Sequence, residues 1–257
     1  MKKIFLILFF SIFLIANTQD TIKSLIGEKK FNTYKELLTP ILNKNASIKD
    51  ILEYLQDNGL LDIFLSKPTF IHPKFIFLDN NPVFDTKTLY NTLNSIGYFS
   101  YYPINITKKE NFKITLELNS KTYINPLLFI KTIEKKGCKV IDIKKEASYI
   151  YKIDCSNQYL DTDKITKKYS HLINAKGIYW LNTNNFKKVV IYTSKFDKWY
   201  PYIVLYDKNL KIIDIKISQN HKRKVYLDIP FNCKYIKIAD YYSQENFKRG
   251  ITFKGIK

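Results

Sequence analysis

The sequence predicts an α+β protein of two domains, with about three tandem αββ repeat units over residues 20–156 and an antiparallel β-sandwich over residues 177–257. Two patterns predict this architecture. Helix-start residues and glycines recur at a constant spacing in the first part, and short β-rich runs without helical periodicity fill the last part. The chain is long enough for two cores, because 46% of its 257 residues are hydrophobic.

The first 16 residues form the most specific pattern in the chain, that of a secretory signal peptide. Lys2 and Lys3 supply a positive start, and Ile4–Ala16 is an apolar run of 13 residues with a single serine. A membrane-spanning helix needs about 18 or more apolar residues, so the run predicts cleavage after Ala16, export to the periplasm and no transmembrane span in the mature chain. An uncleaved anchor is the alternative, because Leu14 is larger than the small residue usual at that place.

Three candidate helices within residues 20–156 share one pattern of start and stop signals. Each begins with a residue that can cap free N–H groups and ends twelve residues later at a glycine, which can adopt the left-handed conformation beyond a helix. The pairs are Ser47 and Gly59, Asp85 and Gly97, and Asn125 and Gly137. Apolar residues four and eight positions after each cap predict one buried helical face: Ile51 and Leu55, Leu89 and Leu93, and Phe129 and Ile133.

Each of these helices is followed by two strand-like runs joined by a polar turn, which completes the αββ pattern. The predicted strand pairs are 60–65 with 75–78, 98–106 with 112–118, and 138–143 with 149–154. Successive units are 38 and 40 residues apart, a spacing typical of structural repeats.

The last strand pair predicts a disulfide between Cys138 and Cys155. A hairpin with the four-residue loop Lys145–Ser148 pairs residues whose numbers sum to 293, so the two cysteines lie opposite each other, near disulfide range. Export places them in an oxidising compartment where the bond can form; two buried free thiols are the alternative. Cys233 is left over, and we expect a small core residue at the start of a strand.

Residues 157–176 are polar and weakly patterned, so we expect a linker there. From Gly177 onward, seven β-rich runs separated by turn signals predict the sandwich. These runs are 178–181, 189–193, 199–206, 210–217, 224–229, 235–239 and 251–253.

Several motifs of core and strand type lie in this segment: Trp180, the run Trp199 to Tyr202 before the Tyr206-Asp207 turn, the run Tyr235 to Ile238, and the run Arg249 to Phe253. With these motifs the segment resembles the galactose-binding-like jelly-roll modules that many exported proteins carry. The resemblance covers under a third of the chain. It implies a β-sandwich that binds sugars, binds proteins or has only a structural role. The αββ units look, more loosely, like the small periplasmic modules that serve as docking domains in envelope assemblies.

The charge of the chain is strongly positive, with 42 basic and 23 acidic residues and a net charge of +19. Only Arg223 and Arg249 are arginines, whereas nucleic-acid readers favour arginine for its planar, bidentate fork. We therefore expect no nucleic-acid partner. The many lysines accompany abundant Ile, Asn, Phe and Tyr, a set that A/T-rich codons encode; the alternative is a selected interaction with an acidic envelope polymer.

The sequence contains no recognisable catalytic or metal-binding motif. His72, His171 and His221 share no short spacing with cysteines or carboxylates, and seven glycines leave no phosphate-binding loop. The acidic residues of the last segment are expected to cap turns or face solvent: Asp197, Asp207, Asp214 and Asp240. We therefore expect no catalytic residues, no metal and no cofactor.

An aromatic run is the candidate recognition surface. Alternation along residues 199–206 places Trp199, Ile203 and Leu205 on one face of a strand and the tyrosines on the other. The candidate binding patch consists of Trp199, Tyr200, Tyr202 and Tyr206, with Lys195 and Lys198 at its edge. The alternative is that these rings only complete the core and cover the sheet.

These observations predict an exported, non-enzymatic protein that binds or scaffolds other molecules in the bacterial cell envelope. Its partner would be another envelope protein, docked through the αββ units and the sandwich. A carbohydrate- or peptidoglycan-binding protein that uses the sandwich is the first alternative. A hydrolase with an unrecognised site is the second.

The signal peptide gives the first testable prediction. If Ile4–Ala16 directs export and is removed, the mature chain begins at or near Asn17 and is recovered in the soluble periplasmic fraction. N-terminal sequencing of the fractionated protein measures this directly. Recovery of Met1 from a membrane pellet would contradict cleavage and favour the anchor.

Overall fold

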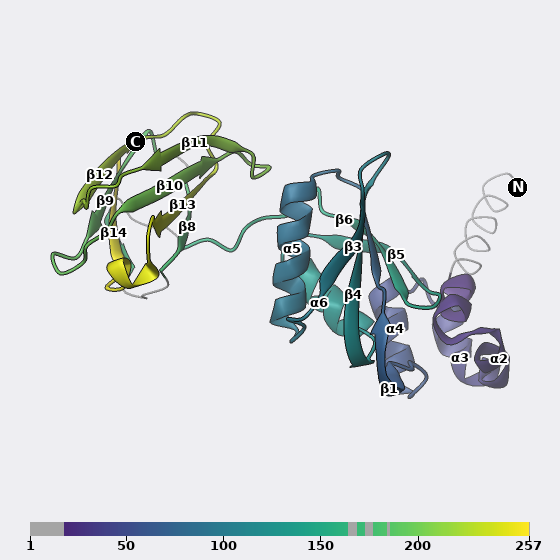
Figure 1. Ribbon diagram of the computed structural model, residues 1–257. Coiled ribbons are helices and arrows are strands. Elements are labelled where there is room, and N and C mark those ends of the chain that lie inside the picture. Colours follow the sequence, from purple (N-terminus) through teal and green to yellow (C-terminus); the bar gives the residue numbers. More distant parts are fainter. Residues whose placement is uncertain (1–17, 164–168, 173–176, 184–185, 257) are drawn as a thin grey trace, which may run out of the picture. The chain divides into compact units, whose positions relative to one another are not determined.

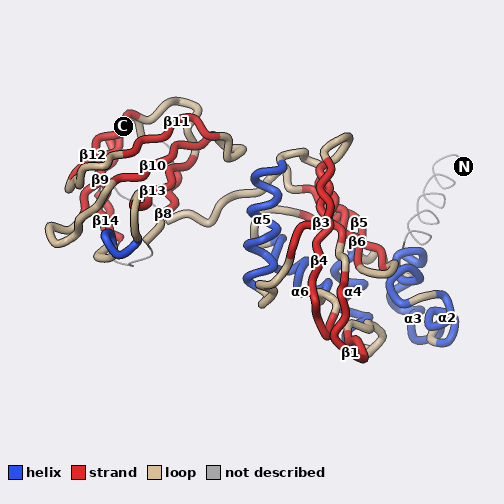
Figure 2. The backbone as a smooth tube through the Cα atoms, in the orientation of Figure 1, coloured by secondary structure: helices blue, strands red, loops and turns tan. Residues whose placement is uncertain are grey.

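The computed structural model describes residues 18–163, 169–172, 177–183 and 186–256, so the predicted signal peptide lies outside the described residues (Figure 1). The chain divides into two compact units, residues 1–159 and 160–257. The protein is mixed α+β, as predicted. Helices and strands alternate in the first unit, whereas strands and loops make up most of the second (Figure 2).

The first unit begins with helical residues 18–26 and continues through five further described helices. These are α2 (Glu28–Thr33), α3 (Lys35–Leu42), α4 (Ile48–Asp57), α5 (Pro82–Ser95) and α6 (Pro126–Glu134). None of the described helices is long and apolar enough to cross a membrane.

One six-stranded sheet holds the first unit together. Its strands are β1 (Phe64–Ile71), β2 (Lys74–Phe77), β3 (Tyr102–Thr107), β4 (Phe112–Thr122), β5 (Lys139–Lys145) and β6 (Tyr149–Asp154). The strand order is β1-β4-β2-β6-β5, and β3 pairs with the remaining edge of β4. All pairs are antiparallel except β2 with β6.

The first predicted strand pair is wrong, because β1 and β2 do not pair with each other. Both pair with β4 in one register, in which Ile71 lies opposite Leu118 and Lys74 lies opposite Thr115. β1 and β2 therefore follow each other along the same edge of β4. The pairing is interrupted at residues 72–73, because Pro73 lacks the N–H group that a β-ladder needs. The second and third predicted pairs, β3 with β4 and β5 with β6, are confirmed.

Two of the three predicted helix starts are confirmed. Ser47 caps α4 in a reciprocal capping box with Asp50, and the Asn125 side chain accepts from the N–H of Leu128. Asp85 is not a cap, since α5 begins earlier, at Pro82. Proline at a first helical position carries the right φ already and loses no hydrogen bond, so it sets the start of this helix.

The predicted helix-ending glycines are confirmed. Gly59, Gly97 and Gly137 have φ of 65°, 93° and 83°. After each of them the next N–H donates to the carbonyl five residues back, as from Leu60 to Leu55 at 2.8 Å. Only glycine adopts this left-handed conformation without strain, so these positions stop the helices.

The predicted helical faces form the core of the first unit. All six predicted apolar residues of α4, α5 and α6 are buried and belong to one cluster. Alternate residues of the sheet join them, as along β4, where Phe112, Ile114, Leu116 and Leu118 are buried. The helices therefore cover one face of the sheet.

The predicted disulfide between Cys138 and Cys155 is present. The predicted register holds next to it, where Val140 lies opposite Ile153. A bulge then shifts the pairing by one residue, so the loop has three residues instead of four and Lys145 lies opposite Tyr149. Cys233 is a buried free thiol just before a strand, as expected.

The second unit consists of two four-stranded antiparallel sheets. One has the order β11-β10-β13-β8, with β11 (Ile212–Ile217), β10 (Pro201–Tyr206), β13 (Tyr235–Asp240) and β8 (Tyr179–Asn182). The other has the order β12-β9-β14-β7, with β12 (Lys224–Asp228), β9 (Lys188–Thr193), β14 (Ile251–Ile256) and β7 (Tyr169–Leu172). A 3-10 helix, η1 (Gln244–Phe247), precedes β14.

Both sheets contribute to one core, which includes Leu181, Ile203 and Ile236 from the first sheet and Ile191 and Phe253 from the second. Seven of the eight described strands lie where the sequence predicts them. The eighth, β7, lies inside the predicted linker and pairs with β14. The sequence did not predict this strand, because a short strand at the edge of a sheet needs few apolar residues and so lacks a strand-like pattern.

Two of the helix-ending glycines provide a matched test of packing. A Cβ atom on Gly137 would lie 2.3 Å from the carbonyl oxygen of Asn157, whereas a Cβ on Gly59 meets no atom within 4 Å. We expect Gly59→Ala to cost about 1–2 kcal/mol of unfolding free energy through its left-handed backbone. Gly137→Ala should cost at least about 1 kcal/mol more, because the Asn157 backbone must also move. Urea denaturation of both variants measures the difference, and equal costs would contradict the packing argument.

Candidate functional site

The outward side of the sheet β11-β10-β13-β8 carries a group of aromatic and aliphatic side chains. Directly opposed residues of neighbouring strands point to the same side, and Val204 lies between Ile215 and Lys237 in this sheet. On the next strand, Trp180 lies opposite Lys237. Tyr235 and Ala239 share this side but are buried. Seven further residues of the side are named the aromatic face: Trp180, Tyr202, Val204, Tyr206, Ile215, Ile217 and Lys237.

Two pairs of side chains on the aromatic face contact each other. The rings of Trp180 and Tyr206 lie 5.3 Å apart, and Lys237 Nζ lies 5.8 Å from the ring centroid of Tyr202. Ile215 and Ile217 are 44% and 50% exposed. Val204 is buried, at 1% exposure. The accessible part of the face is therefore made of aromatic rings, two isoleucines and one cation, a combination that suits ligands which stack on rings.

The structure separates the residues of the predicted binding patch. Tyr202 and Tyr206 lie on the aromatic face, as alternation along the strand predicts. Trp199 is fully buried, and its indole N–H donates to the carbonyl of Ala239 at 2.9 Å. It is a core residue and not part of a binding surface. Tyr200 precedes β10 and packs edge-on against Tyr242.

The two lysines of the predicted patch lie in the loop 194–200, before β10. Lys195 Nζ lies 5.0 Å from the ring of the exposed Phe196, and Lys198 is also exposed. Between them the carboxylate of Asp197 is buried and pairs with Arg249 at 2.8 Å. Asp197 was expected to cap a turn or face solvent; it instead ties this loop to the segment before β14.

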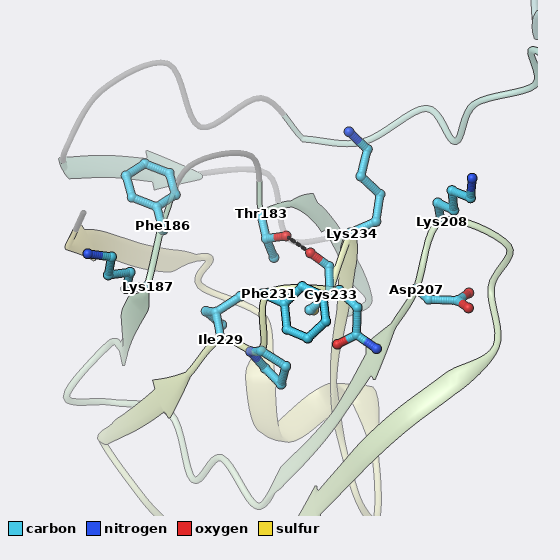
Figure 3. Close-up of a pocket in the computed structure, with 11 residues that line it drawn as sticks. Thr183, Phe186, Lys187, Asp207, Lys208, Ile229, Phe231, Cys233 and Lys234 are labelled. Atoms are coloured by element: carbon cyan, nitrogen blue, oxygen red, sulfur yellow. Dashed lines mark hydrogen bonds between the residues drawn. The ribbon is translucent and has the colours of Figure 1, made fainter.

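A pocket of about 680 Å³ opens at one end of the second unit (Figure 3). Three segments line it: Thr183 with residues 186–187, residues 207–208 and residues 229–234. Phe231 stands among them fully exposed, with Phe186 and Lys187 on one side and Asp207 and Lys208 on the other (Figure 3). The volume lies within the usual range for small-ligand sites, about 300–1,000 Å³. We call this hollow the loop-end pocket.

The charges of the loop-end pocket favour an anion. Lys187, Lys208 and Lys234 line it, against the single acid Asp207. One oxygen of Asp207 already accepts from the N–H groups of Asn209 and Lys211, each at 2.8 Å, so this carboxylate caps its turn as predicted. The pocket therefore offers positive charge beside an aromatic ring.

The same pocket lacks the features of an activated nucleophile. The Cys233 thiol is buried and donates to the carbonyl of Tyr235, and burial raises its pKa. The Thr183 hydroxyl is also engaged, since it donates to the carbonyl of Cys233 at 2.7 Å. Activation would require a lowered thiol pKa or an adjacent base. Neither residue is set up for covalent catalysis.

A group of buried and half-buried polar residues lies in the first unit, next to the disulfide. Asp79, Asp85 and Cys155 bring two carboxyl oxygens and a sulfur within 4.8 Å of one another. The Gln158 amide donates to both acids, at 3.2 Å to Asp79 and 2.8 Å to Asp85, and the Thr88 hydroxyl donates to Gln158. The Cys155 sulfur is bonded to Cys138 and is no thiolate, so this group does not supply the ligands of a metal site.

Asp85 is the most perturbed acid of this group. Its side chain is fully buried within α5, and burial raises its pKa from 3.8 to about 8, with repulsion from Asp79 adding to the effect. Asp79 Oδ1 is itself buried without a hydrogen-bond partner. A proton on Asp85 supplies that partner, because two adjacent carboxyls can share one proton.

Neither the loop-end pocket nor the buried acids were predicted. The pocket is built from segments that are distant in the sequence and meet only in the fold. One local signal was available: Phe231 is a large apolar residue in a turn between Pro230 and Asn232, where burial is not expected. The acid pair had no such signal, since it depends on how α5 packs beside Gln158.

The shared proton gives a prediction about pH. The native first unit holds this proton up to about pH 8, whereas the unfolded chain releases it near pH 4. The stabilisation is therefore complete below about pH 4 and is lost as the pH rises to 8, by at most about 1.4 kcal/mol per pH unit. Asp85→Asn should flatten this pH dependence and raise the unfolding free energy at pH 8.

Urea denaturation at pH 5, 6, 7 and 8 measures the effect, and Asp142→Asn on β5 is the matched control for the loss of one acidic side chain. An equal slope in the wild-type protein and in Asp85→Asn would show that Asp85 does not hold the proton.

Comparisons with known proteins do not place the chain in a family. No protein-family model matches it, and no curated protein matches its sequence. Among solved structures, the chain is similar to the secreted serine protease VesC from Vibrio cholerae, at 9% identity and a TM-score of 0.23. The match covers 60% of this chain and 39% of that chain, so well under two thirds of the protease is spanned. A likeness at this TM-score supports no argument about fold or activity.

Proposed function

We propose that the protein is an exported binding protein of the bacterial cell envelope whose second unit binds an anionic carbohydrate polymer. The observation that carries the proposal is the loop-end pocket, in which a fully exposed phenylalanine stands among three lysines. The predicted resemblance to galactose-binding-like modules agrees with a sugar ligand. The pocket chemistry adds the preference for an acidic one.

Each part of the pocket has a role in this proposal. The Phe231 ring provides an uncovered apolar face against which the C–H groups of a sugar ring can pack. The lysine ammonium groups provide point charges for carboxylate or phosphate substituents. The exposed Asn232 side chain supplies a donor and an acceptor for hydroxyl groups.

The aromatic face extends the same binding surface toward longer ligands. Tyr206 directly precedes the pocket residue Asp207, and its carbonyl accepts from the N–H of the pocket residue Lys234 at 2.7 Å. A polymer whose end lies in the pocket can therefore continue along Tyr206 and Trp180, whose rings already lie together. A small free anion bound in the pocket would not reach the aromatic face.

The geometry favours binding over hydrolysis. Cleavage of a glycosidic bond ordinarily needs two carboxyl groups on either side of the scissile bond. The described lining of the pocket includes one acid, Asp207, which is occupied by its own turn. We therefore prefer the binding protein over the hydrolase among the functions that the sequence suggests.

Export supports the envelope as the site of action. The disulfide between Cys138 and Cys155 suits an oxidising compartment, and the apolar run 4–16 predicts a signal peptide. Polymers of the envelope are rich in acidic groups, which a chain of net charge +19 would meet with favourable electrostatics.

Titration calorimetry with oligogalacturonate tests the proposal. We expect saturable binding to this acidic oligosaccharide and much weaker binding to a neutral maltooligosaccharide of equal length. Phe231→Ala should weaken oligogalacturonate binding about tenfold or more, because the ring that packs against the sugar is lost. The double variant Lys187→Gln, Lys208→Gln should also weaken it and should remove most of its salt dependence.

Tyr226→Ala is the matched control, because Tyr226 is a 66% exposed aromatic residue of the same unit that does not line the pocket. It should bind as the wild-type protein does. Equal binding by Phe231→Ala and the wild-type protein, or equal affinity for the acidic and the neutral sugar, would refute the proposed site.

A further inference from the structure

The strand β3 leaves one edge of the first unit's sheet open. Thr115 of β4 pairs with Lys74 on one side and with Asn105 on the other, so β3 and β2 lie on opposite edges of β4. Among the described residues, β3 pairs with β4 alone. Every second residue of such an edge turns its N–H and C=O groups outward, where another strand can pair with them.

The exposed side chains along this edge are apolar. Every residue of β3 is exposed, and its large side chains are exposed by half or more: Tyr102 by 66%, Ile104 by 51% and Ile106 by 57%. Phe99, just before the strand, is 74% exposed. Contiguous apolar exposure of this kind on a water-soluble surface marks an interaction site.

The edge also lacks the charges that ordinarily protect such strands. Residues 88–107 contain no charged side chain, although 25% of the whole chain is charged. At the opposite end of the same sheet, β5 carries Lys139, Asp142, Lys144 and Lys145. Charged side chains keep sheet edges from pairing with other chains. Charged side chains are thus present on the edge strand β5 and absent from the edge strand β3.

Two features limit how much of the edge can pair. Pro103 has no N–H to donate, and a bulge interrupts the register between Pro103 and Asn105. The usable edge is therefore Ile104–Thr107, with the exposed rings of Tyr102 and Phe99 before it. The exposed Lys108 and Lys109 follow it directly.

We propose that an extended segment of a partner protein, acidic at its N-terminal end and apolar beyond it, adds to the first unit as a strand along β3. Antiparallel addition is the more stable arrangement and places the partner's N-terminal end beside Lys108 and Lys109. The apolar part then lies along Ile106 and Ile104 toward Tyr102. The lysines at one end and the rings at the other fix the direction of the bound segment.

A second copy of the chain is a poorer occupant. Each copy carries a net charge of +19, so two copies repel each other. A copy of β3 also brings no acidic residue to pair with Lys108 or Lys109, since Ile96–Thr107 is uncharged. The complementary partner is therefore a different chain with acidic residues.

Fluorescence anisotropy with two labelled peptides tests the proposal on the full chain. The probe has the sequence Glu-Glu-Val-Thr-Val-Thr-Val, and its charge-reversed counterpart begins with Lys-Lys. We expect saturable binding of the acidic peptide and at least about tenfold weaker binding of the lysine peptide. N-methylation of alternate amides in the acidic peptide should abolish binding, because it removes the strand pairing but leaves the side chains.

The double variant Ile104→Lys, Ile106→Lys should no longer bind the acidic peptide. Because both positions are exposed, the variant should still fold, which circular dichroism can check. Ile141→Lys on β5, where the side chain is 43% exposed, is the matched control and should bind as the wild-type protein does. Hydrogen exchange should slow at residues 104–107 when the peptide is bound. Absence of binding, unchanged binding by the double variant, or a dimer of the chain that the double variant dissociates would overturn the proposal.

Discussion

Backbone pairing along β4 is the constraint on which the first unit depends. One edge of β4 pairs with β2 and the other with β3, and a third strand, β1, continues the line of β2. This ladder turns Ile114 and Leu116 toward the helices, where they are fully buried. It also leaves β3 at the end of the sheet. A shift of one residue would turn these isoleucine and leucine side chains to solvent, so the core and the open edge are fixed by the same register.

A second constraint acts through the hairpin β5–β6. The disulfide closes its ends, and β6 pairs in parallel with β2, so the hairpin is held to the centre of the sheet. Gln158 follows shortly after β6, and its side-chain amide donates hydrogen bonds to both Asp79 and Asp85. Two adjacent carboxyls, one of them fully buried, would repel each other if both were charged, but one shared proton and one shared amide satisfy them together. The end of the first unit is thus held in two ways. The disulfide stabilises it at any pH, whereas the stabilisation by the acid pair depends on pH.

Local chemistry made much of this fold predictable, and long-range packing explains what was missed. The glycines and apolar positions of α4, α5 and α6 act within one helix turn or two, and each was found where expected. Asp85 failed as a helix cap because a proline three residues earlier starts the helix, and its burial depends on Gln158, far along the chain. Alternation placed Tyr202 and Tyr206 correctly on one face of β10. It also placed Trp199 with Ile203 and Leu205, and Trp199 does fill the core with them, so including it in the binding patch was wrong. The loop-end pocket joins three distant segments, so the only local signal for it was an apolar residue, Phe231, in a turn.

The position of the lysines matters more for binding than the high net charge of the chain. Most of the lysines are spread along the chain, as a biased composition would leave them, and contribute little through specific pairs. Those beside exposed apolar side chains are different, because they add direction to surfaces that would otherwise attract any apolar group. Lys187 and Lys208 flank Phe231 in the second unit, and Lys108 and Lys109 follow the isoleucines of β3 in the first. Both surfaces combine exposed apolar side chains with nearby positive charge. An apolar surface alone would promote aggregation, whereas this combination selects ligands that carry negative charge beside an apolar portion.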